Sequence, residues 1–266
     1  MIEIIKHKKS ITVYKNIHIQ PTTFGEFTKE QLKFIVSCKI YMMYYKIDEI
    51  ITNIPNTITH IVFLNNKINI NIQHYLPNSI KHIEFNNIFN SQVDNLPSNL
   101  LNLQFGKYFN QPVDNLPMGV KRLQFGEQFN HPANYLPESL ENIGFGYKFN
   151  QDISNLPVGL KFIQLGNNFS YPIDNLPDSV QIIRFAISNW KCDKNYIISK
   201  LPKNIKKIKL PWRFQGIFNA TIPVSIEKIT THIIGSYNDK IISNHLVNLG
   251  LDISIKEKIE INNIYG

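Results

Sequence analysis

A Leu-Pro dipeptide recurs every twenty residues through the middle of this 266-residue chain. Each copy opens a segment of nearly the same pattern, and the copies begin at Leu76, Leu96, Leu116, Leu136, Leu156 and Leu176. A period of this length is typical of a solenoid, in which each unit is too small to bury its own apolar face and is stable only when stacked on its neighbours. The period therefore predicts the architecture before any single residue is interpreted.

The best-formed unit spans residues 96–115 and reads LPSNLLNLQFGKYFNQPVDN. Looser copies begin at Ile54, Leu201 and Ile222, so the repeat array is expected to span residues 54–234. Self-similarity of this strength over so many copies indicates a regular stack with one rung per unit.

A short strand is expected in the middle of each unit. Leu103 and Phe105 would alternate inward on it, so that Asn102 and Gln104 point outward. A glycine follows the strand, at Gly106, Gly126, Gly146 and Gly166. Glycine at this place suits either a bend with positive φ or a close approach of two backbones.

A phenylalanine stands three residues after the glycine position, which is Asn86 in the first copy, and an asparagine or serine follows it directly. The phenylalanines are Phe89, Phe109, Phe129, Phe149 and Phe169, and the residues after them are Asn90, Asn110, Asn130, Asn150 and Ser170. We expect the rings to form a buried spine and the carboxamides, also buried, to form a ladder of hydrogen bonds between rungs. The Leu-Pro step then turns the chain back towards the next strand, because proline fixes φ and lacks a donor.

The segment FGKYFNQP at residues 105–112, followed by Leu-Pro and an amphipathic strand, resembles the FNIP repeat, a subclass of the leucine-rich repeats. The family pattern usually runs two residues longer than the central units here. The resemblance implies a protein-interaction solenoid without catalytic residues, often joined in amoebal and giant-virus proteins to an F-box that docks onto a ubiquitin ligase.

The predicted fold is a β-rich, leucine-rich-repeat-like solenoid. It is expected to be a right-handed coil of about eight short rungs with a parallel sheet on its concave face, and with a small α/β cap at the N-terminus. The predicted organisation is an N-terminal cap or degenerate adaptor segment at 1–53, the solenoid at 54–234 and a C-terminal cap at 235–266.

Two segments of the N-terminal region have recognisable patterns. The run ITVYKNIHI, residues 11–19, alternates like a strand. Residues 28–50 open with a Thr-x-x-Gln capping box and then show helical spacing, although their β-branched and tyrosine content leaves a strand as the alternative. A cap is the simpler interpretation; a degenerate F-box is the other, but neither its Leu-Pro opening nor sufficient helical length is present.

The outward strand residues vary from unit to unit, whereas the inward residues do not. Variable side chains on a rigid ladder are how such solenoids display a binding surface, so we predict that a partner protein binds there. The predicted site consists of His82, Glu84, Asn102, Gln104, Arg122, Gln124, Asn142, Phe162, Gln164, Ile182 and Arg184. Ordinary solvated strand residues are the alternative interpretation.

A basic stretch follows the regular units. The formal net charge is +8, and the stretch contains Lys203, Lys206, Lys207, Lys209 and Arg213. Such a patch could face an acidic protein or a nucleic-acid backbone. Nucleic acid is the less favoured partner, because the aromatic residues at fixed repeat positions belong to the core and are not available for base stacking.

No enzyme, cofactor or metal site is predicted. His60 and His82 occupy equivalent places on adjacent rungs, but no carboxylate or thiol completes a metal site. Asp94, Asp114 and Asp174 recur where aspartate suits a turn. No phosphate-binding glycine loop and no pairing of a nucleophile with a base is present.

Composition indicates a soluble intracellular protein. Hydrophobic residues make up 43% of the chain, enough for a continuous core. Two cysteines, Cys38 and Cys192, favour a reducing compartment over a disulfide framework. The N-terminus lacks a signal-peptide pattern, and the most apolar stretch, residues 34–47, is too short to span a membrane. The expected location is the cytoplasm, or the host cytoplasm if the protein is viral.

Two functional hypotheses follow. The first is a non-catalytic scaffold that binds a protein partner through the concave strand face, with a substrate-recognition role linked to a ubiquitin ligase as its finer form. The alternative is a structural or nucleic-acid-associated protein that uses the basic C-terminal end.

Overall fold

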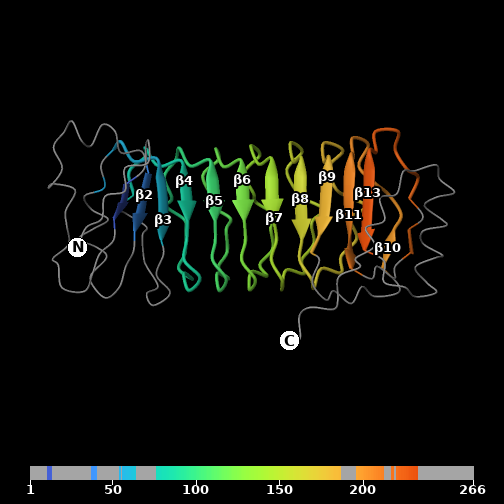
Figure 1. Ribbon diagram of the computed structural model, residues 1–266, viewed down its shortest axis with the longest axis horizontal. Helices are drawn as coiled ribbons and strands as arrows, with labels where there is room; N and C mark the ends of the chain where they lie inside the picture. Colours follow the sequence, from blue (N-terminus) through green and yellow to red (C-terminus); the bar gives the residue numbers. More distant parts are fainter. Residues whose placement is uncertain are drawn as a thin grey trace, which may run out of the picture. The chain divides into compact units, whose positions relative to one another are not determined.

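The computed structural model describes residues 11–13, 37–40, 54, 56–63, 76–186, 196–212, 217–218 and 220–232. The chain divides into two compact units, Met1–Leu140 and Glu141–Gly266. Within the described ranges every regular element is a β-strand, and in each unit most strands lie side by side in one sheet (Figure 1).

The strands of the first unit pair in parallel in the order of the sequence. They are β1 (Ile11–Val13), β2 (Ser37–Ile40), β3 (His60–Phe63), β4 (His82–Glu84), β5 (Asn102–Gln104) and β6 (Arg122–Gln124). Pairing is in register, so that Leu103 lies opposite Ile83 on one side and Leu123 on the other. One repeat therefore makes one turn of the coil and one strand of the sheet.

The second unit has the same arrangement. Its main sheet contains β7 (Asn142–Gly144), β8 (Phe162–Leu165), β9 (Ile182–Phe185), β11 (Lys207–Trp212) and β13 (Lys228–His232), in that order. Two further strands, β10 (Ile197–Ile198) and β12 (Ile217–Phe218), form a separate parallel pair. The register of β11 against β13 shifts between Lys209 and Trp212, where Pro211 has no N–H to donate to a ladder.

The parallel sheet extends into the segment that the sequence assigns to the N-terminal cap. Strand β1 lies within the predicted strand at 11–19 and pairs with β2, which pairs with β3. Over Ser37–Ile40 the helix predicted for residues 28–50 is wrong and the strand alternative is correct, because this stretch pairs with neighbours on both sides. The remainder of both predicted caps lies outside the described residues.

In the four rungs that contain β4, β5, β6 and β7, two phenylalanines stack on one another in the core. The ring of Phe105 lies 3.7 Å from the ring of Phe109 in the same rung, centroid to centroid, and both side chains are buried. Between rungs, Phe105 lies 5.6 Å from Phe85 and from Phe125, while Phe109 lies 6.0 Å from Phe89. The predicted spine is confirmed, and the phenylalanines that end the strands form a second column beside it.

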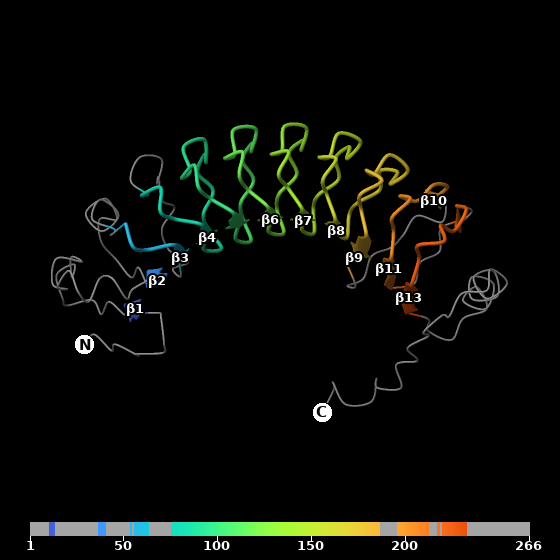
Figure 2. The same cartoon turned by 90° about the horizontal axis from the view of Figure 1, so that it is seen from above.

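The column spacings give the local curvature of the first unit. Neighbouring strands lie about 4.8 Å apart, whereas the ring spacing is 5.6 Å at Phe85 and Phe105 and 6.0 Å at Phe89 and Phe109. Rungs are thus closer together at the strands than behind them. The strand side is the inner side of this unit, and Figure 2 shows strands along one side of each unit and turns along the other.

Asparagines that follow the spine phenylalanines form the predicted ladder. The Oδ1 atom of Asn90 accepts a bond from the backbone N–H of Asn110 at 2.8 Å, and Oδ1 of Asn110 accepts one from Asn130 at 2.9 Å. In the second unit, Asn150 accepts bonds from the backbone N–H and the hydroxyl of Ser170. The prediction that these carboxamides are buried is wrong, since Asn110 and Asn130 are exposed.

The Leu-Pro steps close the turns that lead into the strands. The carbonyl of Pro97 accepts a bond from the N–H of Leu100 at 3.0 Å, and the carbonyl of Pro117 accepts one from Val120 at 3.1 Å. The preceding leucine is buried in these rungs. Each step therefore combines a β-turn with an apolar anchor, which fixes where the strand begins.

The glycine after the strand is required by a close approach of two backbones. A Cβ atom built on Gly126 would lie 1.9 Å from the carbonyl oxygen of Gly106, and one on Gly166 would lie 1.7 Å from that of Gly146. No side chain fits at such distances. Of the two explanations that the sequence left open, close approach is therefore the correct one.

Replacement of a spine phenylalanine should destabilise the fold strongly. We expect Phe129→Ala to lower the free energy of unfolding by about 3–5 kcal/mol, because it leaves a cavity in both stacking directions. Urea denaturation followed by circular dichroism measures this loss. Tyr135→Ala is the control, because Tyr135 is 72% exposed, and should change stability by less than about 0.5 kcal/mol. Equal losses in the two variants would contradict the proposed role of the spine.

Two glycines of one rung should respond oppositely to alanine. Gly126→Ala should cost at least about 1–3 kcal/mol, since its Cβ would meet a fixed backbone oxygen. A Cβ on Gly119 would lie 3.5 Å from the nearest atom, the carbonyl oxygen of Leu100. Gly119→Ala should therefore be neutral or stabilising by up to about 1 kcal/mol, through the lower entropy of the unfolded chain. Thermal unfolding of both variants decides the matter, and a stable Gly126→Ala protein would refute the close-approach explanation.

Candidate functional site

We call the outward side chains of the strands in the main sheet the strand face. Outward residues alternate with buried ones along these strands, as in β9, where Ile183 and Phe185 are buried and Ile182 and Arg184 are not. In-register pairing places equivalent outward residues of adjacent strands about 4.8 Å apart. The strand face of each unit therefore consists of two parallel rows.

The rows of the first unit are mainly polar. The first row is His60, His82, Asn102 and Arg122, and the second is Val62, Glu84, Gln104 and Gln124. The structure brings these predicted site residues together as neighbours on consecutive strands. Gln104 and Arg122 are exposed, whereas His82, Glu84, Asn102 and Gln124 are partly buried.

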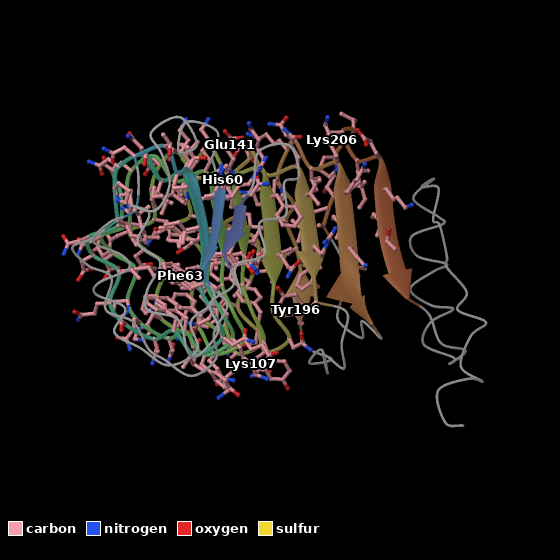
Figure 3. The ribbon with its side chains drawn as sticks, turned by 60° about the vertical axis from the view of Figure 1, so that its left-hand side comes forward. His60, Phe63, Lys107, Glu141, Tyr196 and Lys206 are labelled. Atoms are coloured by element: carbon pink, nitrogen blue, oxygen red, sulfur yellow. The ribbon has the colours of Figure 1, made fainter. Side chains whose placement is uncertain are left out.

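The two histidines of the first row stack face to face. Their ring centroids lie 3.8 Å apart at an interplanar angle of 7°, closer than the separation of about 5 Å expected for equivalent residues on adjacent strands. Nδ1 of His60 is 2.7 Å from the hydroxyl of Thr59, and the carboxamide nitrogen of Asn102 contacts Nδ1 of His82. Figure 3 shows His60 and Phe63 at opposite ends of β3.

The environment of His82 disfavours its protonated form. Partial burial of the imidazole lowers the pKa of His82, and positive charge on His60, Arg122 and Lys81 lowers it further. The neutral ring can accept a hydrogen bond from Asn102, which the protonated ring cannot. The lowered pKa of His82 therefore favours the neutral ring at neutral pH, in which it accepts this bond.

The second row continues this polar character. Gln104 and Gln124 lie opposite each other, and the amide nitrogen of Gln124 donates to the carbonyl of Phe125 at 3.0 Å. Glu84 lies opposite Gln104. Gln104 and Gln124 thus form a polar pair; Gln164, another residue of the predicted site, belongs to the second unit.

The second unit presents a different surface. Its first row runs Asn142, Phe162, Ile182, Lys207 and Lys228, and its second row runs Gly144, Gln164, Arg184, Lys209 and Thr230. Phe162 and Ile182 lie opposite each other and are both partly exposed, so they form a small apolar surface. The guanidinium carbon of Arg184 lies 5.5 Å from the centroid of the Phe162 ring, a cation–π contact.

The predicted basic patch separates into two groups. Lys203 lies in a turn and forms an ion pair with Asp178 at 2.9 Å, which also lowers the pKa of that carboxyl. Lys206 and Lys207 each lie 3.9 Å from a carboxylate oxygen of Glu227. Lys207 and Lys209 point outward from β11, and Arg213 lies outside the described residues.

One further lysine, Lys228, belongs to the basic group but was not among the predicted residues. It lies opposite Lys207 on the adjacent strand β13 and is exposed. A signal for it existed in the sequence, because the loose copies LPKNIKKIKL and IPVSIEKIT each carry a lysine five residues after the proline. Aligning those two copies would have identified the position.

Neither a metal-binding cluster nor a membrane-spanning helix is found among the described residues. In the residue ranges that the structure describes, no group of three or more His, Cys, Asp or Glu side chains is placed to hold an ion. No helix within the same ranges is long and apolar enough to cross a bilayer.

Comparison with protein families matches part of the repeat array. The FNIP Repeat model matches residues 109–148 and 149–186. No match to this chain is found among curated proteins.

Two solved structures are similar to this chain. CroV588 from a giant virus, described as a novel circular LRR protein, is 24% identical, and the match covers 77% of this chain and 41% of CroV588 with a TM-score of 0.49. YopM from Yersinia enterocolitica WA-314 is 14% identical over 75% of this chain and 55% of YopM, with a TM-score of 0.29. The chain spans less than two thirds of the length of either protein.

Titration of His82 tests the electrostatics of the first row. We expect its pKa, followed by NMR of the ring protons, to lie below the ordinary value of 6.5 and to rise in an Arg122→Ala variant, because a like charge is removed. Lys107→Ala is the control and should leave the titration of His82 unchanged. A pKa at or above 6.5 in the unmodified protein would contradict this assignment.

The same group should make stability depend on pH. Since the pKa of His82 is lower in the folded chain, the unfolded chain binds the proton more readily, and stability should fall as pH drops below about 6.5. His82→Gln should reduce this fall, measured by urea denaturation at a series of pH values. An unchanged pH dependence in this variant would show that His82 makes no such contribution.

Proposed function

We propose that this chain, whose residues 109–186 match the FNIP Repeat model and whose strands stack as a parallel β-solenoid, is a non-catalytic scaffold that binds a partner protein through its strand face. The proposed binding module is the repeat array at 54–234, flanked by capping segments at 1–53 and 235–266.

The observation that supports this proposal is the contrast between the two sides of the sheet. The inward residue at the centre of each strand stays aliphatic, as in Ile83, Leu103 and Leu123, and all three are buried. The outward row beside them changes from histidine to asparagine to arginine. A side chain that neither fills the core nor repeats is free to vary with the partner that it contacts.

The outward residues favour binding over catalysis. Catalysis needs a nucleophile, a base and a group that orients the base to converge on one place. The rows instead place different chemical types on successive strands, with polar residues in the first unit and apolar and basic residues in the second. An extended surface of this kind suits a protein partner that contacts several strands at once.

The resemblance to FNIP-repeat proteins extends the proposal to a substrate-recognition role linked to a ubiquitin ligase, acting in the cytoplasm. Purification of the tagged full chain from the cells in which it acts tests this extension. Recovery of ligase subunits supports it, and recovery of a partner without any ligase subunit removes the extension while leaving the scaffold proposal in place.

The alternative is a structural or nucleic-acid-associated protein that binds through the basic residues at its C-terminal end. Its support is reduced by the ion pairs of Lys203 with Asp178 and of Lys206 with Glu227, which neutralise part of the patch. Bound material that is lost only after nuclease treatment of the purified protein would favour this alternative.

A triple substitution on the strand face tests the scaffold proposal. Arg122→Ala, Phe162→Ala and Arg184→Ala together should weaken binding of the co-purified partner at least about tenfold, which corresponds to 1.4 kcal/mol. None of the three side chains is fully buried, so the thermal unfolding temperature should change little. Binding is measured by calorimetry or surface plasmon resonance with the full chain.

A matched control changes three exposed side chains in the turns: Tyr108→Ala, Met118→Ala and Tyr147→Ala, which are 49%, 70% and 50% exposed. This variant should bind the partner as the unmodified chain does. Loss of binding in the control, with binding kept in the strand-face variant, would place the partner on the turns and refute the proposal.

A further inference from the structure

We propose that the strand face of the second unit binds an extended, acidic segment of a partner protein. Carboxylates of that segment would contact Arg184, Lys207 and Lys228, and an apolar side chain would rest on Phe162 and Ile182. This inference rests on the proposed scaffold function and specifies the chemistry of the partner.

Sheet register concentrates the positive charge. Lys207 lies opposite Lys228 on one side and Ile182 on the other, and Lys209 lies opposite Arg184. With strands about 4.8 Å apart and alternate residues about 6.7 Å apart, the Cα atoms of Lys207 and Lys228 lie about 5 Å apart and those of Lys207 and Arg184 about 8 Å apart. The three strands thus carry four outward cations in a small area.

Neutralisation of this cluster from within the chain is incomplete. Like charges on directly opposite strand positions destabilise a sheet. Glu227 is shared between Lys206 and Lys207, and each distance, 3.9 Å, is at the long end for an ion pair. In the described part of the chain, Arg184 and Lys228 have no carboxylate within ion-pair distance. A ligand carboxylate would relieve this repulsion.

Arg184 is already held in a defined orientation. Its guanidinium group lies over the ring of Phe162, with 5.5 Å from the guanidinium carbon to the ring centroid. A guanidinium group offers a planar pair of donors to a carboxylate, and an oriented one loses less conformational freedom on binding. Phe162 and Ile182 add a partly exposed apolar surface beside it, where a partner side chain could be buried.

The arrangement favours a peptide over a nucleic acid. Arg184 lies over the Phe162 ring, so a nucleobase that stacked on that side of the ring would have to displace it. The carboxylate of Glu227, beside Lys206 and Lys207, would repel a continuous phosphate backbone.

Selection from a displayed library of random peptides, about twelve residues long, tests the inference on the full chain. We expect enrichment of peptides with several Asp or Glu residues and at least one large apolar residue. Binding of the best synthetic peptide should weaken at least about tenfold in a variant with Arg184→Gln, Lys207→Gln and Lys228→Gln. It should also weaken with added salt.

A charge-matched control removes three exposed lysines elsewhere: Lys81→Gln, Lys121→Gln and Lys148→Gln. This variant has the same net charge as the test variant and should bind the peptide like the unmodified chain. Thermal unfolding of both variants verifies that each is folded. Equal weakening in the two variants would show a general effect of charge and overturn the inference.

Other outcomes also decide the question. Failure to enrich acidic peptides, or tighter binding of a single-stranded oligothymidine than of the best peptide, would overturn the inference. Selected peptides that lose binding in an Asn102→Ala and Arg122→Ala variant, but not in the test variant, would place binding on the first unit. That result would leave the scaffold proposal intact and remove the acidic segment from it.

Discussion

The in-register stacking of one rung on the next is the constraint on which the rest of the structure depends. Residue 103 lies opposite residues 83 and 123, and the phenylalanine columns repeat this register in the core at 5.6 and 6.0 Å. Because each rung buries its apolar face only against its neighbours, a change at a core position of one rung is transmitted to both sides. This explains why side chains at these positions vary so little.

The same stacking explains the glycine and asparagine positions. Where the chain leaves the strand, consecutive backbones approach so closely that a Cβ on Gly126 would lie 1.9 Å from the carbonyl oxygen of Gly106. At the next bend, the backbone N–H of Asn110 donates a hydrogen bond to the side-chain Oδ1 of Asn90 in the neighbouring rung. Stacking therefore determines residue type even at positions outside the apolar core.

Much of this was predictable from the sequence, because the period specifies which residues are equivalent. It predicted the strands, the phenylalanine spine, the asparagine ladder and the outward rows. It did not predict how deeply the ladder is buried: the carboxamide of Asn110 is exposed, since its donor, the backbone N–H of Asn130, lies in an exposed turn. It also favoured a helix around Ser37–Ile40. The spacing of apolar residues reflects local preference only, whereas this stretch forms a strand because it pairs with β3, which is distant in the sequence.

The departures from the period are informative about the surface. Ile183 and Ile208 pair although they are 25 positions apart, whereas Ile163 and Ile183 pair at the regular 20. The five additional residues do not shift the register, so the outward rows continue unbroken from β9 to β11. Continuity brings Lys209 opposite Arg184 and places Lys207 between Ile182 and Lys228. The apolar and basic residues of the second unit thus form one surface because register is maintained across a longer repeat, and a partner that contacts both needs no rearrangement of the sheet.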